Sequence, residues 1–161
     1  GTATGPNNQW YFEGPSGWGV STVSFTAEGV SNGGTQRYCG TSTLNRYVRF
    51  QPIFDYAGTY RVDIAFPAST NNITQVQYKV KHLEGESTFN INQYNASLAN
   101  IWNTLGEFKF GTEFTSEADL GVYWVEISNP VTTPTGNRFY SGAVRFDYTG
   151  PLSGVENWVL Y

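Results

Sequence analysis

The chain has 161 residues, of which 14% are charged and 17% are aromatic, and its formal net charge is −4. Because soluble domains average about 25% charged residues, this composition predicts a surface made polar mainly by Asn, Ser, Thr and Gly. The absence of any Lys/Arg cluster argues against a nucleic-acid partner. The length fits one domain that buries about 70% of its unfolded surface, and no apolar run approaches the ~18 residues of a membrane span.

The first third of the chain begins with a polar lead-in. Residues 1–9 predict an N-terminal arm or linker, so that residues 10–161 form a single folded domain. Since Gly1 rather than Met opens the sequence, we expect a mature or excised fragment whose export signal has been removed. Short strands are expected within 18–25 and over 47–50.

The clearest pattern lies in the middle of the chain, where four strands follow one another. Apolar and polar side chains alternate over 60–66 and over 76–81, the period-two pattern of strands with one buried face. A short turn containing Gly85 joins the second strand to the third, 89–92, which predicts a hairpin. The fourth strand, 105–110, alternates in the same way.

The last third predicts two more core strands. Residues 122–127 are apolar on both faces and belong in the middle of a sheet, whereas 142–148 alternate as a one-sided strand. Only 96–100 suggests a helical turn. About nine or ten short strands, with less than about 10% helix, predict an all-β fold, an antiparallel β-sandwich of jelly-roll-like topology. Eight residues are expected to be buried between its two sheets: Tyr60, Val62, Ile64, Val80, Phe108, Trp124, Val144 and Phe146.

Short motifs follow one another in a specific order between residues 47 and 148. They are Gly58, Tyr60 and Val62; Pro67-Ala68-Ser69; His82 and Gly85; Asn92-Gln93; Trp102, Leu105, Gly106, Phe108 and Phe110; and Gly142-Ala143-Val144-Arg145-Phe146. Together they resemble the golvesin and xanthan-lyase carbohydrate-binding-like domain. The resemblance implies a β-sandwich module appended to secreted bacterial polysaccharide lyases, glycosidases, peptidases and cell-wall amidases, and it implies carbohydrate binding. It supplies no catalytic residues, and most matching positions are expected to be core or turn positions.

Few residues could carry catalysis or hold a metal. The one histidine, His82, falls at a strand end, where we expect a structural imidazole, and the one cysteine, Cys39, is expected to be a buried, reduced thiol. Glu117 and Asp119 share a loop that could bind calcium, but their spacing is that of an ordinary solvated loop. Because no pair of catalytic carboxylates is recognisable, the sequence predicts a protein that is not an enzyme and has no metal or cofactor.

Aromatic residues in loops are the candidates for sugar binding. A ring offers a flat apolar face to a pyranose, while Asn, Gln and Arg side chains bond its hydroxyls; the alternative for each ring is that it packs on an end of the sandwich. Trp102 and Trp124 are assigned to the core, and two N-glycosylation sequons, at Asn72 and Asn95, fall in predicted loops. Loop-borne aromatics are Trp10, Tyr11, Trp18, Tyr38, Tyr94 and Tyr140, with Asn71, Asn95, Arg37 and Arg138 near some of them. The predicted carbohydrate-binding residues, expected to form one exposed platform, are Trp18, Tyr38, Tyr94 and Tyr140.

Two functions from different classes remain. The first is a non-catalytic carbohydrate-binding module of a secreted or surface-exposed protein, which holds a polysaccharide or cell-wall glycan through loop aromatics. The second is a structural subunit of a surface layer, filament or virion decoration, which contacts copies of itself or an assembly partner through its N-terminal arm and residues 158–161. Both place the protein outside the cell, and the second also allows a place on a virion surface.

Overall fold

The structure is a computed structural model that describes residues 3–5, 9–14, 17–32, 36–40, 46–113, 122–129 and 138–153. Within this part of the chain it contains fourteen strands and one three-residue 3₁₀ helix, so the predicted all-β class is confirmed. Ten of the described strands have four or more residues, and the other four are three-residue segments. The elements are β1 (Ala3–Gly5), β2 (Gln9–Gly14), β3 (Trp18–Ser21), β4 (Phe25–Ala27), β5 (Val30–Asn32), β6 (Gln36–Gly40), β7 (Tyr47–Pro52), β8 (Gly58–Ala65), β9 (Val76–His82), β10 (Gly85–Ile91), η1 (Ala96–Leu98), β11 (Asn103–Phe110), β12 (Trp124–Ser128), β13 (Arg138–Tyr140) and β14 (Ala143–Gly150).

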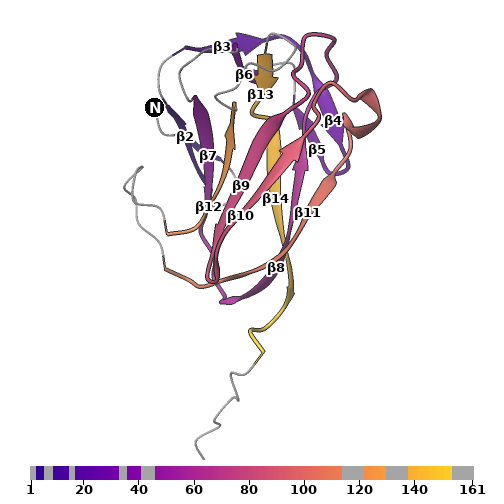
Figure 1. Cartoon of the computed structure of the whole chain (residues 1–161). Coiled ribbons are helices and arrows are strands. Elements are labelled where there is room, and N and C mark those ends of the chain that lie inside the picture. Colours follow the sequence, from indigo (N-terminus) through magenta and orange to yellow (C-terminus); the bar gives the residue numbers. More distant parts are fainter. Residues whose placement is uncertain are drawn as a thin grey trace, which may run out of the picture.

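Two antiparallel sheets form the sandwich (Figure 1). The larger has six strands in the order β1-β2-β7-β12-β9-β10, and the smaller has three in the order β11-β8-β14. The predicted hairpin is formed by β9 and β10, whose register pairs His82 with Gly85 across the turn. β12 lies between β7 and β9, and all five of its residues are buried. The predicted place of this segment in the middle of a sheet is therefore confirmed.

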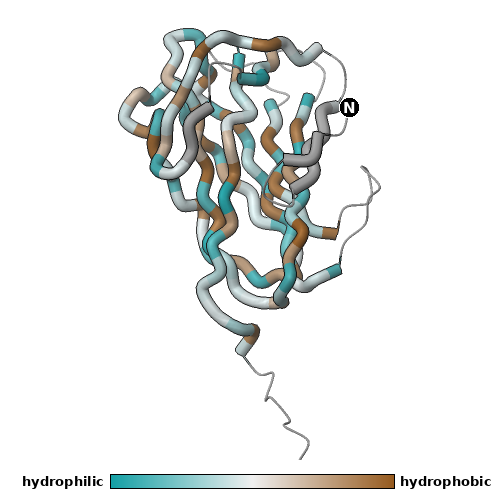
Figure 2. Tube along the Cα trace, turned by 180° about the vertical axis from the view of Figure 1, so that it is seen from behind, coloured by the Kyte–Doolittle hydropathy of each residue, from teal (hydrophilic) through white to brown (hydrophobic). Residues whose placement is uncertain are grey.

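The core lies between the facing sides of these two sheets. Val48, Val80 and Ile127 from the larger sheet are fully buried, as are Val62 and Ile64 from the smaller one. Brown and teal segments alternate along the strands in Figure 2, as expected for strands with one apolar face. Seven of the eight predicted core residues belong here: Tyr60, Val62, Ile64, Val80 and Val144 lie in the main cluster, and Phe108 and Phe146 are half-buried against it.

The eighth residue, Trp124, is buried but does not lie between the two sheets. Its strand neighbour Val125 belongs to the core cluster, as does Ile127, so Trp124 points to the outer face of β12 because side chains alternate along a strand. There the cationic groups of Arg49 and Lys81 lie 4.7 and 5.9 Å from the centre of its ring. The predicted burial of Trp124 is confirmed, but its predicted place between the two sheets is wrong: long cationic side chains, rather than the opposing sheet, cover the indole.

Trp102, which was also assigned to the core, packs in a separate small cluster. It lies against Phe25 and Ala27 of β4 and Ala65 of β8. Its Nε1 donates to the carbonyl oxygen of Glu28, in the β4–β5 turn, at 2.7 Å. Trp102 is therefore half-buried outside the main core. The apolar surface that it covers belongs to β4 and β8, which are distant in the sequence, so the residues around Trp102 do not predict this contact.

The two ends of the sandwich differ. β13-β6-β3 form a third antiparallel sheet, which lies at the same end as the β8–β9 and β10–β11 connections, while the β9–β10 turn lies at the opposite end (Figure 1). We call the first of these the loop end and define it as residues 66–75, residues 92–102 and the β13-β6-β3 sheet. The predicted helical turn belongs to it, as η1.

Some predictions fall on parts of the chain outside the described residues. These include the loop with Glu117 and Asp119 and the C-terminal segment 155–161. Of the predicted N-terminal arm, Ala3–Gly5 forms β1 and pairs with β2 at one edge of the larger sheet, and the domain boundary between residues 9 and 10 stays a prediction. In the ranges that the structure describes, no helix has the length and apolar character needed to cross a membrane.

Cys39 lies in β6 and is a fully buried thiol, which confirms its predicted burial. Its Sγ lies 3.4 Å from the carbonyl oxygen of Gly40 and accepts a hydrogen bond from Nη1 of Arg46 at 3.5 Å. The sulfur is thus enclosed between the third sheet and the guanidinium of the residue that precedes β7.

Thiol reagents should therefore label Cys39 slowly in the folded protein. Labelling needs a local opening that costs about 3 kcal/mol or more, which lowers the rate by about 100-fold relative to the denatured chain. The measurement is the rate of colour release from Ellman's reagent in buffer and in guanidinium chloride. Equal rates in the two solutions, or a covalent dimer on a non-reducing gel, would contradict this expectation.

Candidate functional site at the loop end

A shallow pocket of about 270 Å³ opens at the loop end. One wall is the β8–β9 connection, which contributes Ala68, Ser69 and Thr70, and the other is the β10–β11 connection, which contributes Tyr94 and Ala96. Tyr94 is 54% exposed. The pocket thus combines one accessible aromatic ring with two hydroxyl-bearing residues and two alanines.

The turn that carries Tyr94 is held by its own polar side chains. Oδ1 of Asn92 accepts hydrogen bonds from the backbone N–H groups of Tyr94 and Asn95, at 3.0 and 3.2 Å, which makes an Asx turn. Asn95 then caps η1, because its Oδ1 accepts from the N–H of Ser97 at 3.1 Å and from its Oγ at 2.8 Å. All four bonds are local, so the short sequence around Tyr94 positions this ring at the pocket.

Below the turn, Gln93 ties the site to the core. Its Nε2 donates to the hydroxyl of Tyr78 at 2.7 Å and to the carbonyl oxygen of Tyr140 at 3.0 Å, while its Oε1 accepts from the N–H of Tyr140 at 2.9 Å. Its own carbonyl oxygen accepts from Nδ2 of Asn72 at 3.0 Å. Burial raises the pKa of Tyr78 far above its ordinary value, against the effect of the hydrogen bond from Gln93, so the phenol stays protonated. This buried network joins both pocket walls to β9 and β13.

The third sheet places a cation beside these walls. The guanidinium carbon of Arg138 lies 4.7 Å from the centre of the Tyr38 ring. The same ring crosses β3 at Gly19, where a Cβ would lie 2.7 Å from Tyr38 Cζ. Tyr38 can take this position because Gly19 has no side chain. The face of the Tyr38 ring carries the guanidinium of Arg138.

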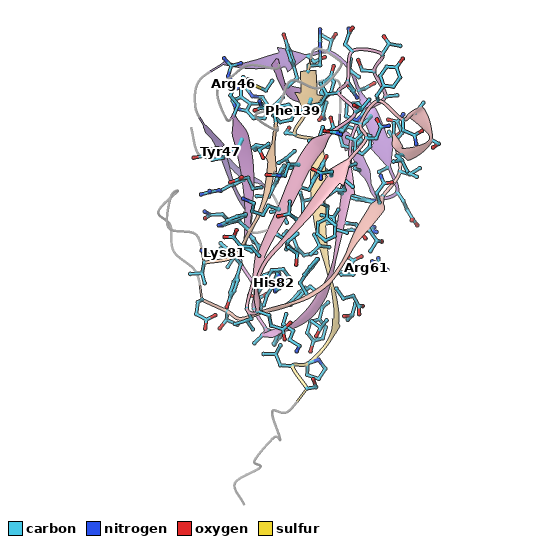
Figure 3. All side chains as sticks on the ribbon, in the orientation of Figure 1. Arg46, Tyr47, Arg61, Lys81, His82 and Phe139 are labelled. Carbon is cyan, nitrogen blue, oxygen red and sulfur yellow. The ribbon has the colours of Figure 1, made fainter. Side chains whose placement is uncertain are left out.

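All four aromatic residues that the sequence singled out belong to the loop end, but they do not form one exposed platform. Tyr94 is exposed, and Tyr38 is half-buried with Arg138 over its ring. Trp18 is half-buried and meets Phe139 edge-on, with ring centres 5.4 Å apart; Figure 3 labels Phe139 at this end. Tyr140 is 0% exposed, so the expectation that it is an accessible loop residue is wrong. Their roles in sugar binding stay predictions.

Tyr140 was misplaced because its neighbours Ser141 and Gly142 are typical of a loop. In the structure it is the last residue of β13 and pairs with Tyr38. Its hydroxyl lies 3.3 Å from Oγ of Ser21 in β3. The partners that bury it are 102 and 119 positions away in the sequence, and no local pattern reports them. Trp10 and Tyr11, also taken as loop residues, lie in β2.

Polar residues at the loop end divide into exposed and buried ones. Asn71 and Asn95 are exposed next to the pocket walls. Asn72, whose sequon fell in a predicted loop, is in that loop but fully buried, with Nδ2 bonded to the carbonyl oxygens of Pro67 and Gln93. The folded protein therefore has no room for a glycan on Asn72. Sequence reasoning did not identify Ser69 and Thr70 as pocket residues. The feature that could have indicated them is a pair of small polar residues directly before Asn71 and Asn72.

His82 lies at the opposite end, in the strand-end position that the sequence indicated. Its Nε2 lies 3.1 Å from Oγ of Ser87, and its ring centre is 5.0 Å from that of Phe108. Burial lowers the pKa of His82, while the charge of Glu84 acts in the opposite direction. Nδ1 accepts from the N–H of Glu84 at 3.3 Å, so both ring nitrogens have partners within the hairpin.

Charged side chains gather on the outer faces of both sheets, on opposite sides of the molecule (Figure 3). Arg61 belongs to the smaller sheet, and Lys81 to the larger one. On the larger sheet, Nε of Arg49 donates to Glu126 at 2.8 Å.

Of the residues in the described ranges, no three His, Cys, Asp or Glu gather where they could hold a metal ion.

These features define an all-β sandwich module with a small pocket at its loop end. The profile of the Golvesin C-terminal domain family matches residues 7–122, so the chain belongs to this family. The resemblance seen in the motifs is thereby confirmed, although the match begins earlier than those motifs and ends before the segment at residues 142–146. No curated protein matches the sequence.

A solved structure has the same fold. The xanthan lyase of Paenibacillus aligns with 91% of this chain at a TM-score of 0.62 and 22% sequence identity. The aligned part is 14% of the lyase, so the chain spans about one seventh of that protein. At this identity the likeness shows the fold alone, and it covers a larger share of the chain than the family match does.

Proposed function

We propose that this domain is a non-catalytic module that binds a polysaccharide at the loop end and belongs to a secreted or cell-surface protein. The observation that carries the proposal is the exposed ring of Tyr94 at a pocket lined by Ser69 and Thr70. The family match supports it, and so does the fold shared with a lyase named for a polysaccharide, xanthan.

The chemistry of the pocket suits a sugar ring. Tyr94 offers a flat apolar face for stacking on the C–H side of a pyranose, and the methyl groups of Ala68 and Ala96 extend that apolar contact. The hydroxyl groups of the pocket and the exposed amide of Asn71 can bond sugar hydroxyls. Because the turn of Tyr94 is preordered by local hydrogen bonds, little conformational entropy is lost on binding.

The residues at this end support binding without catalysis. The two connections that form the pocket, 66–75 and 92–102, contain no Asp or Glu. A glycosidase needs two carboxyl groups on either side of the scissile bond, and neither wall supplies one. We therefore assign the loop end a role in holding a polymer for a partner domain.

Replacing Tyr94 with Ala should weaken polysaccharide binding by about 10-fold or more, because an exposed stacking ring contributes about 1–3 kcal/mol. The matched control is Tyr148→Ala, which removes a ring of similar exposure, 51%. Tyr148 lies near the end of β14, away from the loop end of the sandwich. The measurement is affinity electrophoresis in gels that contain xanthan, a pectic polymer or a soluble peptidoglycan fragment, with thermal unfolding of each variant as a check on folding.

Two results would count against the proposal. One is equal retardation of the Tyr94 and Tyr148 variants, which would place the site elsewhere. The other is unchanged migration of the wild-type domain in every gel. That outcome would favour the assembly subunit, and the molar mass in solution, from light scattering, would then distinguish a self-associating protein from a monomer.

A further inference from the structure

Arg138 lies beside the wall of the pocket. Its backbone N–H donates to the carbonyl oxygen of Asn71 at 3.0 Å, and its carbonyl oxygen accepts from the N–H of Ile73 at 2.9 Å. The start of β13 is thus bonded to the same β8–β9 connection that contributes Ser69 and Thr70 to the pocket. Arg138 and Tyr94 therefore both adjoin one loop.

The guanidinium of Arg138 has no ion-pair partner within the described ranges. Four other cations, Arg49, Arg61, Lys109 and Arg145, each pair with a carboxylate there. The two connections at the loop end contain no charged residue of either sign. A half-buried positive charge beside neutral loops is a site that attracts an anion.

Stacking on Tyr38 also orients this cation. A guanidinium that covers a ring face keeps its N–H groups in its own plane, so they remain available at its edge. For Arg138, we find no hydrogen bond from those N–H groups to any described residue. Tyr38 thus carries a guanidinium whose donors have no described partner, in place of an open aromatic face.

We infer that the glycan bound at the loop end is acidic and that Arg138 holds one of its carboxylates, an inference that rests on the glycan binding proposed above. The fork of a guanidinium matches a carboxylate in a bidentate geometry. Tyr94 stacks on a sugar ring, and Arg138, which is bonded to the same loop, bonds the uronic-acid or other carboxylate-bearing sugar next to it. Neutral polymers occupy only the Tyr94 side.

The test compares one polymer with and without its charge. Wild-type protein should bind polygalacturonate at least about 10-fold more tightly than the same polymer after its carboxyl groups are reduced to alcohols, because charge-assisted hydrogen bonds are lost. Arg138→Gln should bind both forms about equally, and its affinity for the reduced polymer should equal that of the wild type. The control is Lys79→Gln, which removes a cation from the larger sheet and should keep the preference.

Three further arms separate the possible outcomes. Arg138→Lys keeps the charge without the fork and should retain only part of the preference, which also covers the case in which Arg138→Gln does not fold. Dextran sulfate should gain less over dextran than the carboxylate gains; an equal gain would overturn the assignment to a carboxylate. Equal binding of native and reduced polymer by the wild type overturns the inference and leaves the proposed function intact, whereas binding to no polymer overturns both.

Discussion

Asp63→Asn is expected to lower the free energy of unfolding by about 2–3 kcal/mol, because it removes the charge of a carboxylate that is buried among its partners. Asp63 is 1% exposed in the middle of β8, on the outer face of the smaller sheet. Its Oδ1 accepts from Oγ1 of Thr104 at 2.7 Å, and its Oδ2 accepts from Arg145 Nη2 at 2.6 Å and Arg61 Nε at 3.1 Å. Asn has the same shape, so the change tests the charge rather than packing.

The matched control is Asp147→Asn. Asp147 pairs with the same two arginines, at 2.6 Å from Arg61 and 3.1 Å from Arg145, but its side chain is 40% exposed. An exposed pair contributes at most about 1 kcal/mol, so this variant should lose less stability than Asp63→Asn. Urea unfolding at neutral pH measures both changes in the free energy of unfolding. Equal losses would show that burial of the carboxylate does not increase its contribution to stability.

The same carboxylate makes stability depend on pH. Burial alone would raise the pKa of Asp63, but the hydrogen bonds from Thr104 and Arg145 and the charges of Arg61 and Arg145 outweigh it, so the pKa is lowered below its ordinary value of 3.8. A group with a lowered folded pKa stabilises the fold fully above its unfolded pKa and loses that contribution as the pH falls through the folded value. The difference between wild type and Asp63→Asn should therefore shrink in acid below about pH 4.

Gly142→Ala should cost about 3 kcal/mol or more, because it combines backbone strain with a steric clash. Gly142 joins β13 to β14 at a φ of +59°, and a Cβ there would overlap the carbonyl oxygen of Ala65. That oxygen belongs to the central strand of the smaller sheet and cannot move without disturbing the pairing of Ala143 with Ala65. The new methyl group therefore pushes the β13–β14 link away from β8.

Gly29→Ala is the control for the strain alone. Gly29 has a φ of +78°, but a Cβ there would meet nothing within 4 Å. We expect a loss of about 1 kcal/mol at this position. Urea unfolding of the two variants measures the difference, which is the cost of the clash, and equal losses would mean that the Ala65 carbonyl can give way.

Several motif positions acquire a physical reason in the structure. Gly142 is required by the close approach of Ala65, and Gln93 by three buried hydrogen bonds to Tyr78 and Tyr140. Sequence reasoning placed both in a family pattern but could not say what they do. The partners of Gln93 lie 15 and 47 positions away, so their contact exists only after the strands have paired.

The amino-acid sequence by itself determined strands β7 to β12 and β14, the hairpin and the all-β class, because a buried face imposes alternation on neighbouring residues. It also determined the turn of Tyr94, whose four hydrogen bonds are local. Only the tertiary structure decided which aromatic rings reach solvent: Tyr140 is buried by strands far away in the chain, and Trp124 lies under Arg49 on the outer face. Exposure depends on everything that packs around a side chain, and most of those neighbours are distant in sequence.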